Sequence, residues 1–343
     1  MICKLFLIPF IVSFMISAAL LIMLILLNRK KTFDDARNSE RHIHHRGISR
    51  FGGAALVISF MVALLFNKML VITVPLIGIF IASGAILIFG IIDDIRQVSW
   101  KIQLFFQVVV VLFIYLMGVR LQYMTNPLGG IFLFNDYFGY VIGLAIALIW
   151  IVLLMNSMNW IDGVDGVSPG ITFIGGAAIF ILSLRPEVNQ PPISIITAAL
   201  LGGAAALIFF NFYPAKILAG TSGSMFMGFI LAILAIFAGA KIATTLLVMA
   251  VPIIDAFWVI SERIRSRSSI FSADKRHLHY RLMELGWSQK KICFFYYLIT
   301  VFIAIIALNT GAIGKTIVFV FFAFVMVGLL VIISKKVNVG KKM

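Results

Sequence analysis

Residues 139–166 read GYVIGLAIALIWIVLLMNSMNWIDGVDG. The part from 139 to 157 carries no charged residue and is close to the roughly 20 residues that a transmembrane helix needs. It runs into a polar segment, Asn159 to Gly166, that contains Asp162 and Asp165 but no Lys or Arg. Because carboxylates are costly inside a bilayer, those placed where a span meets water are candidates for a functional site. The stretch predicts a membrane helix that ends in such a site.

The rest of the chain is also rich in apolar residues and poor in charged ones. Of the chain's 343 residues, 62% are hydrophobic and only 12% are charged, and the mean hydropathy is +1.11. A soluble domain carries about 25% charged residues. We therefore expect an all-α polytopic membrane protein with about eleven transmembrane helices. The expected spans are 5–27, 53–67, 70–91, 102–118, 139–157, 169–184, 192–212, 223–240, 243–261, 293–309 and 315–334. Fusion of the second and third runs would give ten.

The positive charges predict the orientation of these spans. With the N-terminus outside and the C-terminus in the cytoplasm, the outer segments keep only six basic residues out of 28, namely Lys4, Lys68, Arg120, Arg185, Lys241 and Lys315. Cytoplasmic loops collect Lys and Arg, so this asymmetry favours that orientation. No gap between spans is long enough for a soluble domain. We expect one integral-membrane domain over 1–343, with cytoplasmic loops near 28–52, 92–101, 158–168, 213–222 and 262–292.

The net charge of +15 also fits a nucleic-acid-binding protein. The positive-inside distribution accounts for it more simply, so we predict no nucleic-acid partner. Contact with anionic lipid headgroups is compatible with the same distribution.

The acidic residues favour chemistry on the cytoplasmic side. Most of the 13 acids fall in the predicted inside segments. Asp93 and Asp94 end one apolar run, and two adjacent carboxylates cannot both be buried and charged without a cation. Lys101 is close enough in sequence to pair with a phosphate. The alternative is a simple charge cluster at the end of a helix.

Asp162 and Asp165 are spaced so that they would face the same way on a helical turn. Gly163 and Gly166 leave room for close approach of a ligand. Asn159 adds a neutral hydrogen-bonding group. A metal or substrate site is one interpretation, and an ordinary loop between two spans is the other.

Four further segments carry weaker signals. The turn Gly220 to Ser224 precedes a predicted span, and such a turn offers free backbone N–H groups to an anion. In the loop 272–281, Arg276, His277 and His279 suit a phosphate, although a positive inside loop is the alternative. Arg50 precedes the pair Gly52-Gly53, which suggests a tight or phosphate-facing turn. Asp255 follows Pro252 inside a span and is either a packing acceptor or a member of the site.

In these segments the chain resembles the polyprenyl-phosphate N-acetylhexosamine-1-phosphate transferases, and in particular their UDP-GlcNAc:undecaprenyl-phosphate branch. The resemblance runs in order from about residue 35 to 292. The segments that carry it are Arg50 to Gly53, Gly90 to Asp94 with Lys101 and Gln107, Asn159 to Gly166, Gly223 to Gly228, Pro252 to Asp255, and Phe271 to Leu282.

The resemblance implies an eleven-helix fold in the bacterial cytoplasmic membrane with a cytoplasmic active site. It implies Mg²⁺ as cofactor, with Mn²⁺ as an alternative, a UDP-N-acetylhexosamine donor and undecaprenyl phosphate as acceptor. A homodimer is kept as a hypothesis. The implied catalytic residues are Asp93, Asp94, Asp162, Asp165 and His279, the substrate-binding residues are Asn159, Lys101, His277, Arg276, Arg50 and Ser224, and the metal ligands are Asp94, Asp162 and Asp165.

The chain departs from the family pattern at three places. Thr221 stands where the family usually has an aspartate that binds the metal, Tyr280 replaces the second histidine of a pair, and Gly47 and Ser49 replace prolines. Two rival functions therefore stay open. One is a catalytically impaired relative that serves as an assembly partner, and the other is a transporter of a lipid-linked anion.

Overall fold

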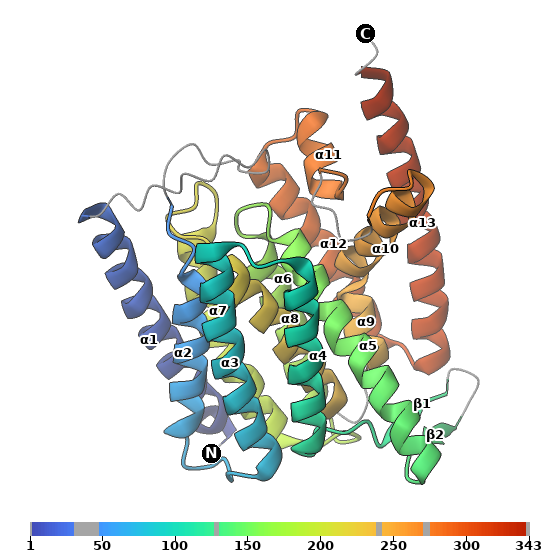
Figure 1. The fold of residues 1–343 in the computed structure, drawn as a ribbon. Coiled ribbons are helices and arrows are strands. Elements are labelled where there is room, and N and C mark those ends of the chain that lie inside the picture. The colour runs from blue at the N-terminus through green and yellow to red at the C-terminus, as the bar shows by residue number, and fades with distance from the viewer. Residues whose placement is uncertain (1, 31–47, 127–129, 238–241, 270–274, 341–343) are drawn as a thin grey trace.

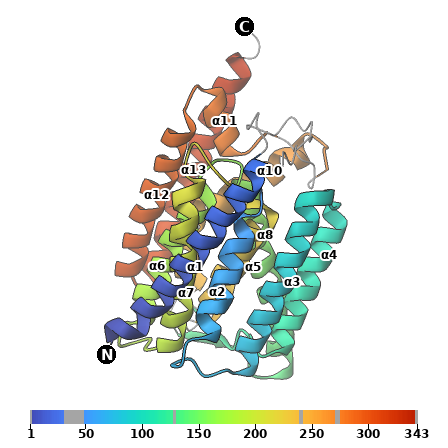
Figure 2. The same ribbon diagram turned by 90° about the vertical axis from the view of Figure 1, so that its left-hand side faces the viewer.

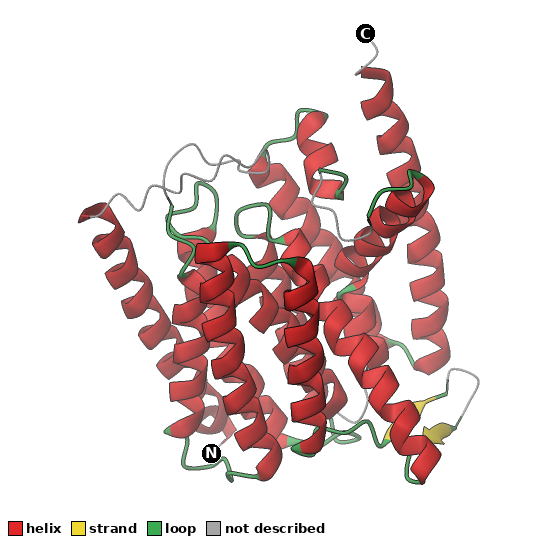
Figure 3. Ribbon diagram, in the orientation of Figure 1, coloured by secondary structure: helices red, strands yellow, loops and turns green. Residues whose placement is uncertain are grey.

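The computed structural model describes residues 2–30, 48–126, 130–237, 242–269 and 275–340, and helices dominate these residues (Figures 1 and 3). Two short strands, β1 (Tyr123–Thr125) and β2 (Ile131–Leu133), pair antiparallel. The helices are α1 (Ile2–Lys30), α2 (Gly52–Leu65), α3 (Val74–Arg96), α4 (Trp100–Leu116), α5 (Tyr137–Ile161), α6 (Val167–Ser183), α7 (Pro191–Asn211), α8 (Gly220–Phe237), α9 (Ile242–Val248), α10 (Ala250–Arg265), α11 (Leu278–Glu284), α12 (Gln289–Asn309) and α13 (Ala312–Gly340).

The helices confirm an all-α polytopic membrane protein. In the described part of the chain, seven helices are long and apolar enough to cross a membrane, or up to eight if the bent pair α9–α10 is one span. Three shorter apolar helices, α2, α4 and α6, occupy three more of the expected runs. Because α2 and α3 are separate helices, the alternative in which their two runs fuse into one span does not apply. The total of eleven crossings and the orientation stay predictions.

The outer helices explain why this fold needs lipid. On α13 the side chains of Phe321 and Phe324 are 68% and 80% exposed, and on α1 Met15 is 61% exposed. A soluble protein rarely exposes so continuous an apolar surface. Figure 2 shows α1 lying along α2 and α7 at the edge of the bundle.

Helix α8 forms the centre of the bundle. Almost all of its side chains are buried, and it packs against α2, α3, α5 and α6. Phe226 of α8 meets Phe60 of α2 edge to face, with ring centroids 5.2 Å apart. The beginning of α8 is therefore surrounded by neighbouring helices, which places its first turn in the interior of the site described below.

Glycines allow two helices to touch the first turn of α8. A Cβ atom built on Gly53 of α2 would lie 2.1 Å from the backbone nitrogen of Gly223. A Cβ atom built on Gly90 of α3 would lie 2.2 Å from the Cα atom of Ser222. Only a residue without a side chain permits such close approach of two backbones. This contact brings the end of α3, with Asp93 and Asp94, against Thr221.

The predicted span 243–261 is broken. Helices α9 and α10 meet at Met249 with a bend of 73°. Pro252 lies in the first turn of α10, where its missing N–H leaves no intrahelical hydrogen bond unmade. The bend lets α10 approach α5 and α13, and it carries Asp255 towards the loop that precedes α11.

The segments that we predicted to be cytoplasmic lie, where they are described, at one end of the bundle (Figure 1). The end of α3, the α5–α6 loop, the start of α8 and helix α11 are all found there, whereas β1 and β2 lie at the other end. In the sequence, the histidines His42, His44 and His45 could also be interpreted as a metal-binding tract. They lie outside the described residues.

Candidate active site

The carboxylates of Asp93 and Asp94 are held by the first turn of α8. The Thr221 hydroxyl donates to Oδ2 of Asp93 at 2.7 Å, and the Thr221 backbone N–H donates to both oxygens of Asp94 at 3.1 and 3.0 Å. Gly220, with φ of +70°, precedes this turn, and a Cβ there would lie 2.5 Å from Asp94 Oδ2. Both acids are almost fully buried. The acid pair is thus anchored by a neutral side chain and a helix N-terminus.

The other carboxylate oxygen of Asp93, Oδ1, is held by the residues that follow α3 and by helix α4. Gln97 adopts a left-handed conformation that ends α3, and the chain then turns so that Val98 N–H donates to Asp93 Oδ1 at 2.9 Å. Gln103 of α4 donates to the same oxygen at 2.8 Å. With Thr221, Asp93 accepts three hydrogen bonds, so both of its oxygens are fixed in place.

Asp162 and Asp165 lie in the turn between α5 and α6 and not on a helix. The prediction that they share a helical face is wrong, because α5 ends at Ile161. The Ser168 hydroxyl donates to Asp162, whereas Asp165 Oδ2 accepts from the backbone N–H of Ala215 at 3.0 Å. Asp165 therefore joins the α5–α6 loop to the segment before α8.

The charge state of Asp162 responds to its neighbours. Burial raises the pKa of the Asp162 carboxyl to about 7, and the carboxylates of Asp94 and Asp165 add to the rise. The hydrogen bond from Ser168 and the charge of Arg50 act in the opposite direction. These mutual effects indicate that Asp94, Asp162, Asp165 and Arg50 share one electrostatic environment.

Asn159 and Ser224 also come together as predicted members of one site. The Ser224 hydroxyl donates to Oδ1 of Asn159 at 2.8 Å and lies 2.9 Å from the carbonyl oxygen of Gly220. The end of α5 is thereby tied to the first turn of α8.

Helix α11 brings the two histidines to the acidic loop. A Cβ atom built on Gly163 would lie 2.6 Å from Nε2 of His279, so the imidazole packs directly on that glycine. The ring of His277 lies 5.8 Å from the ring of Trp160 and is parallel to that of His279 at 5.9 Å. Both histidines are buried.

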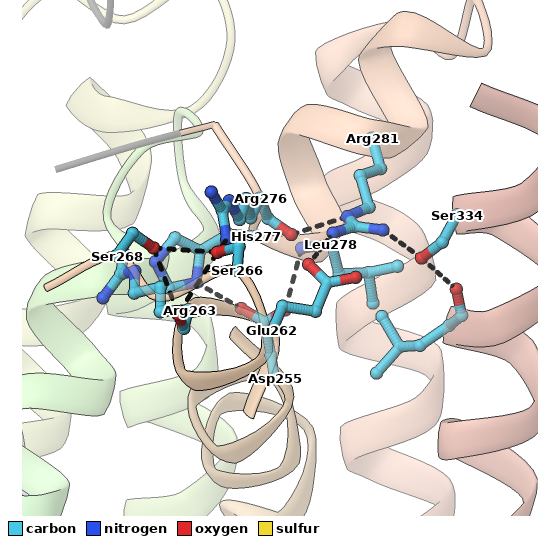
Figure 4. A network of polar contacts seen from close by, with 11 residues as sticks. Asp255, Glu262, Arg263, Ser266, Ser268, Arg276, His277, Leu278, Arg281 and Ser334 are labelled. Carbon is cyan, nitrogen blue, oxygen red and sulfur yellow. Dashed lines mark hydrogen bonds and ion pairs between the residues drawn. The ribbon is translucent and has the colours of Figure 1, made fainter. Parts of the chain in front are cut away.

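The three remaining predicted cations differ in their placement. Arg50 lies close to the acids, because its carbonyl oxygen would be 2.2 Å from a Cβ atom on Gly220. Arg276 donates to the hydroxyl of Ser266 at 2.7 Å, which lies just after α10 (Figure 4). Lys101 is exposed, and its described contact is with the ring of Trp100 at 5.8 Å. Gln103 reaches Asp93 from the same helix instead.

Three residues that our sequence analysis did not single out hold the site together. Asn211 accepts from Gly166 N–H at 2.9 Å and donates to the carbonyl of Ile217 at 2.8 Å, and Tyr297 donates to the carbonyl of Gly166 at 2.5 Å. Gln103 is the third. The available signal was a polar side chain near the end of an apolar run, where an unpaired polar group would be costly.

Each of the predicted metal ligands has a hydrogen-bond partner within the protein. Among the described residues, no group of three or more His, Cys, Asp or Glu side chains has an arrangement that could hold a metal ion. Asp94, Asp162 and Asp165 each accept a hydrogen bond from a different protein group. The Thr221 hydroxyl donates a hydrogen bond to Asp93, at the position where the family resemblance implies an aspartate.

Replacing Thr221 by aspartate tests the role of this position. A carboxylate there would face Asp93, since the two side-chain oxygens are now 2.7 Å apart. Like charges at about 4 Å repel by about 4 kcal/mol near a protein surface. In chelator we expect Thr221→Asp to unfold at a lower temperature than Thr221→Asn. Added Mg²⁺ should raise the unfolding temperature of Thr221→Asp and so remove the difference. Thermal unfolding of both variants across a Mg²⁺ titration measures this.

Thr221→Asn is the matched control, because asparagine has the size of aspartate without its charge. Mg²⁺ is expected to leave its unfolding temperature unchanged. Equal responses of the two variants to Mg²⁺ would contradict the interpretation of position 221 as a vacant ligand position.

Comparison with known proteins finds relatives that are all named as transferases. The model of the family described as "Glycosyl transferase family 4" matches residues 76–239 of this chain. A probable undecaprenyl-phosphate N-acetylglucosaminyl 1-phosphate transferase of Bacillus subtilis is 28% identical, over 88% of this chain and 84% of that protein. A decaprenyl-phosphate N-acetylglucosaminephosphotransferase of Mycolicibacterium smegmatis is 30% identical, over 79% of this chain and 74% of that protein. A phospho-N-acetylmuramoyl-pentapeptide-transferase of Borreliella afzelii is 28% identical, over 79% of this chain and 84% of that protein.

Proposed function

The chain belongs to glycosyl transferase family 4, and we propose that it transfers N-acetylglucosamine 1-phosphate from a UDP-sugar to a polyprenyl phosphate, with release of UMP. The observation that carries this proposal is the gathering of four carboxylates and two histidines at one end of a membrane-embedded bundle. The named relatives are all transferases, and neither a transporter nor an assembly partner gains support from them.

The proposed reaction joins two anions. An oxygen of the lipid phosphate attacks the sugar-linked phosphorus of the donor, a new P–O bond forms there, and the bond to the oxygen of UMP breaks. Such phosphoryl transfers are catalysed mainly by positioning and by electrostatic stabilisation. We assign Asp93 as the base that receives a proton from the lipid phosphate. In the alternative, Asp93 orients a phosphate that is already ionised.

The other residues would bind the donor. His277, His279 and Arg276 supply positive or hydrogen-bonding groups for the diphosphate on the side of α11. Arg50 and Lys101 are further candidates for phosphate, and Asn159 with Ser224 for the nucleotide or the sugar.

Mg²⁺ remains part of the proposal. A magnesium ion commonly binds substrate phosphates and only one or two protein carboxylates. Asp94 and Asp162 are the candidates for such an ion arriving with the donor. When bound it would neutralise charge on the diphosphate.

The positive-inside distribution supports placing the site on the cytoplasmic side of a bacterial inner membrane, where a UDP-sugar is available. The proposed acceptor is undecaprenyl phosphate. A homodimer stays a prediction.

Purified protein in lipid nanodiscs tests the function. We expect UMP release when UDP-N-acetylglucosamine and undecaprenyl phosphate are both present, and none when the lipid phosphate is left out. A panel with UDP-N-acetylgalactosamine and UDP-glucose compares donors. If no UDP-sugar of the panel yields UMP with Mg²⁺ or Mn²⁺, the proposed function is wrong.

A further inference from the structure

Asp255 places both of its carboxylate oxygens on the start of α11. Its Oδ2 lies 2.8 Å from Nδ1 of His277, and its Oδ1 accepts from the backbone N–H of Leu278 at 2.8 Å (Figure 4). Asp255 is 2% exposed and His277 is 4% exposed. A buried carboxylate is costly unless it is paired and hydrogen-bonded, and these two contacts meet that requirement.

The two hydrogen bonds have different consequences. Leu278 is the first residue of α11, whose leading N–H groups have no partner within the helix. Asp255 satisfies one of them from a neighbouring helix and so determines where α11 begins. The bond to Nδ1 acts on the side chain, because a carboxylate partner keeps a proton on Nδ1 and fixes the ring orientation.

The opposite edge of the His277 ring is thereby left for another group. The ring lies between α11 and the acidic loop, near Trp160 and His279. None of the hydrogen bonds between described residues involves its Nε2. With the ring held through Nδ1, Nε2 has one defined direction relative to the α5–α6 loop.

We propose that Asp255 is a positioning residue that acts through His277, presenting Nε2 to an oxygen of the substrate diphosphate. The inference rests on the proposed function, since a diphosphate ligand is taken from it. The proposed contact uses the doubly protonated ring, in which Nδ1–H donates to Asp255 and Nε2–H donates to the substrate anion. Such charge-assisted hydrogen bonds are about twice as strong as neutral ones.

A double-mutant cycle on UDP affinity tests this inference. Asp255→Asn keeps an oxygen for Leu278 N–H but removes the charge facing Nδ1, and His277→Gln removes the ring. We expect each single variant to weaken UDP binding about tenfold, in line with the loss of one charge-assisted hydrogen bond. The double variant should also bind about tenfold more weakly, because both changes remove the same interaction. Calorimetry in nanodiscs measures the dissociation constants.

Two further variants separate positioning from docking of α11. Glu262→Gln removes a different contact between α10 and α11, the ion pair with Arg281, without touching His277. It should lower the unfolding temperature and leave UDP affinity unchanged. Asp255→Glu keeps the carboxylate and should restore part of the affinity lost in Asp255→Asn, which also covers the case in which that variant folds poorly.

The outcomes are decisive in each direction. A hundredfold loss in the double variant, an unaltered affinity in either single variant, or an equal loss in Glu262→Gln would overturn the inference. Wild-type protein that binds UDP but releases no UMP would refute the proposed function alone, and the cycle would still decide the role of Asp255. Wild-type protein that does not bind UDP would overturn the inference as well.

Discussion

Asp93→Asn is expected to lower the rate of UMP release by about 1000-fold while the protein stays folded, a loss within the range for removal of a general base. The carboxylate of Asp93 accepts from Val98, Gln103 and Thr221. An asparagine replaces one acceptor oxygen by an NH₂ group, which would face a donor and could receive no proton. Turnover of the purified variant in nanodiscs, together with its unfolding temperature, measures both parts of the prediction.

Asp136→Asn is the control for this substitution. Asp136 caps α5 at the opposite end of the bundle, where its side chain accepts from Gly139 N–H at 2.7 Å. Asparagine is an equally good cap, so activity and stability should be unchanged. Near-normal turnover of folded Asp93→Asn would reject the base assignment, and a loss of only about tenfold would favour the alternative in which Asp93 orients the lipid phosphate.

Gly90→Ala is expected to have the largest effect on stability. The added Cβ would lie 2.2 and 2.4 Å from the Cα and N atoms of Ser222, which are backbone atoms that cannot rotate away. Helices α3 and α8 would have to separate, and Asp93 and Asp94 would lose their contacts with Thr221. Overpacking a core typically costs about 1–3 kcal/mol, and we expect at least the upper end of that range. The rate of UMP release should fall together with the stability.

Gly84→Ala provides a matched control on the same helix. A Cβ atom built on Gly84 meets nothing within 4 Å, and alanine is the better helix former. This variant should be as stable as the wild type or slightly more stable. Thermal unfolding of both variants in the same detergent compares them. If Gly90→Ala unfolds at the temperature of Gly84→Ala, the close contact of α3 with α8 does not exist in the protein.

Much of the site could be predicted because it follows from sidedness. Asp93, Asp162 and His279 are far apart in the chain, but each lies in a segment assigned to the same side of the membrane. The positive charges of the basic loops and the alternation of the spans give that assignment. Their convergence then needed only that alternate loops meet at one end of a bundle. The shared helical face of Asp162 and Asp165 was predicted wrongly, because the distance between two residues in sequence does not show where a helix stops.

The supporting residues could not be predicted in the same way. Asn211 and Tyr297 hold Gly166 from α7 and α12, and neither belongs to a segment with a recognisable motif. Their importance comes from what they meet in space. Thr221 was noticed as a substitution, but its hydrogen bond to Asp93 was not expected.

The amino-acid order alone determines the apolar runs, the predicted sidedness of the loops and the set of polar groups at the ends of the runs. Each of these depends on the cost of desolvating a residue, which is a property of that residue and its near neighbours. The tertiary structure alone decides which donor meets which carboxylate. A hydrogen bond needs its atoms about 3 Å apart, and Thr221 and Asp93, 128 positions apart, reach that distance only because glycines let α3 touch α8.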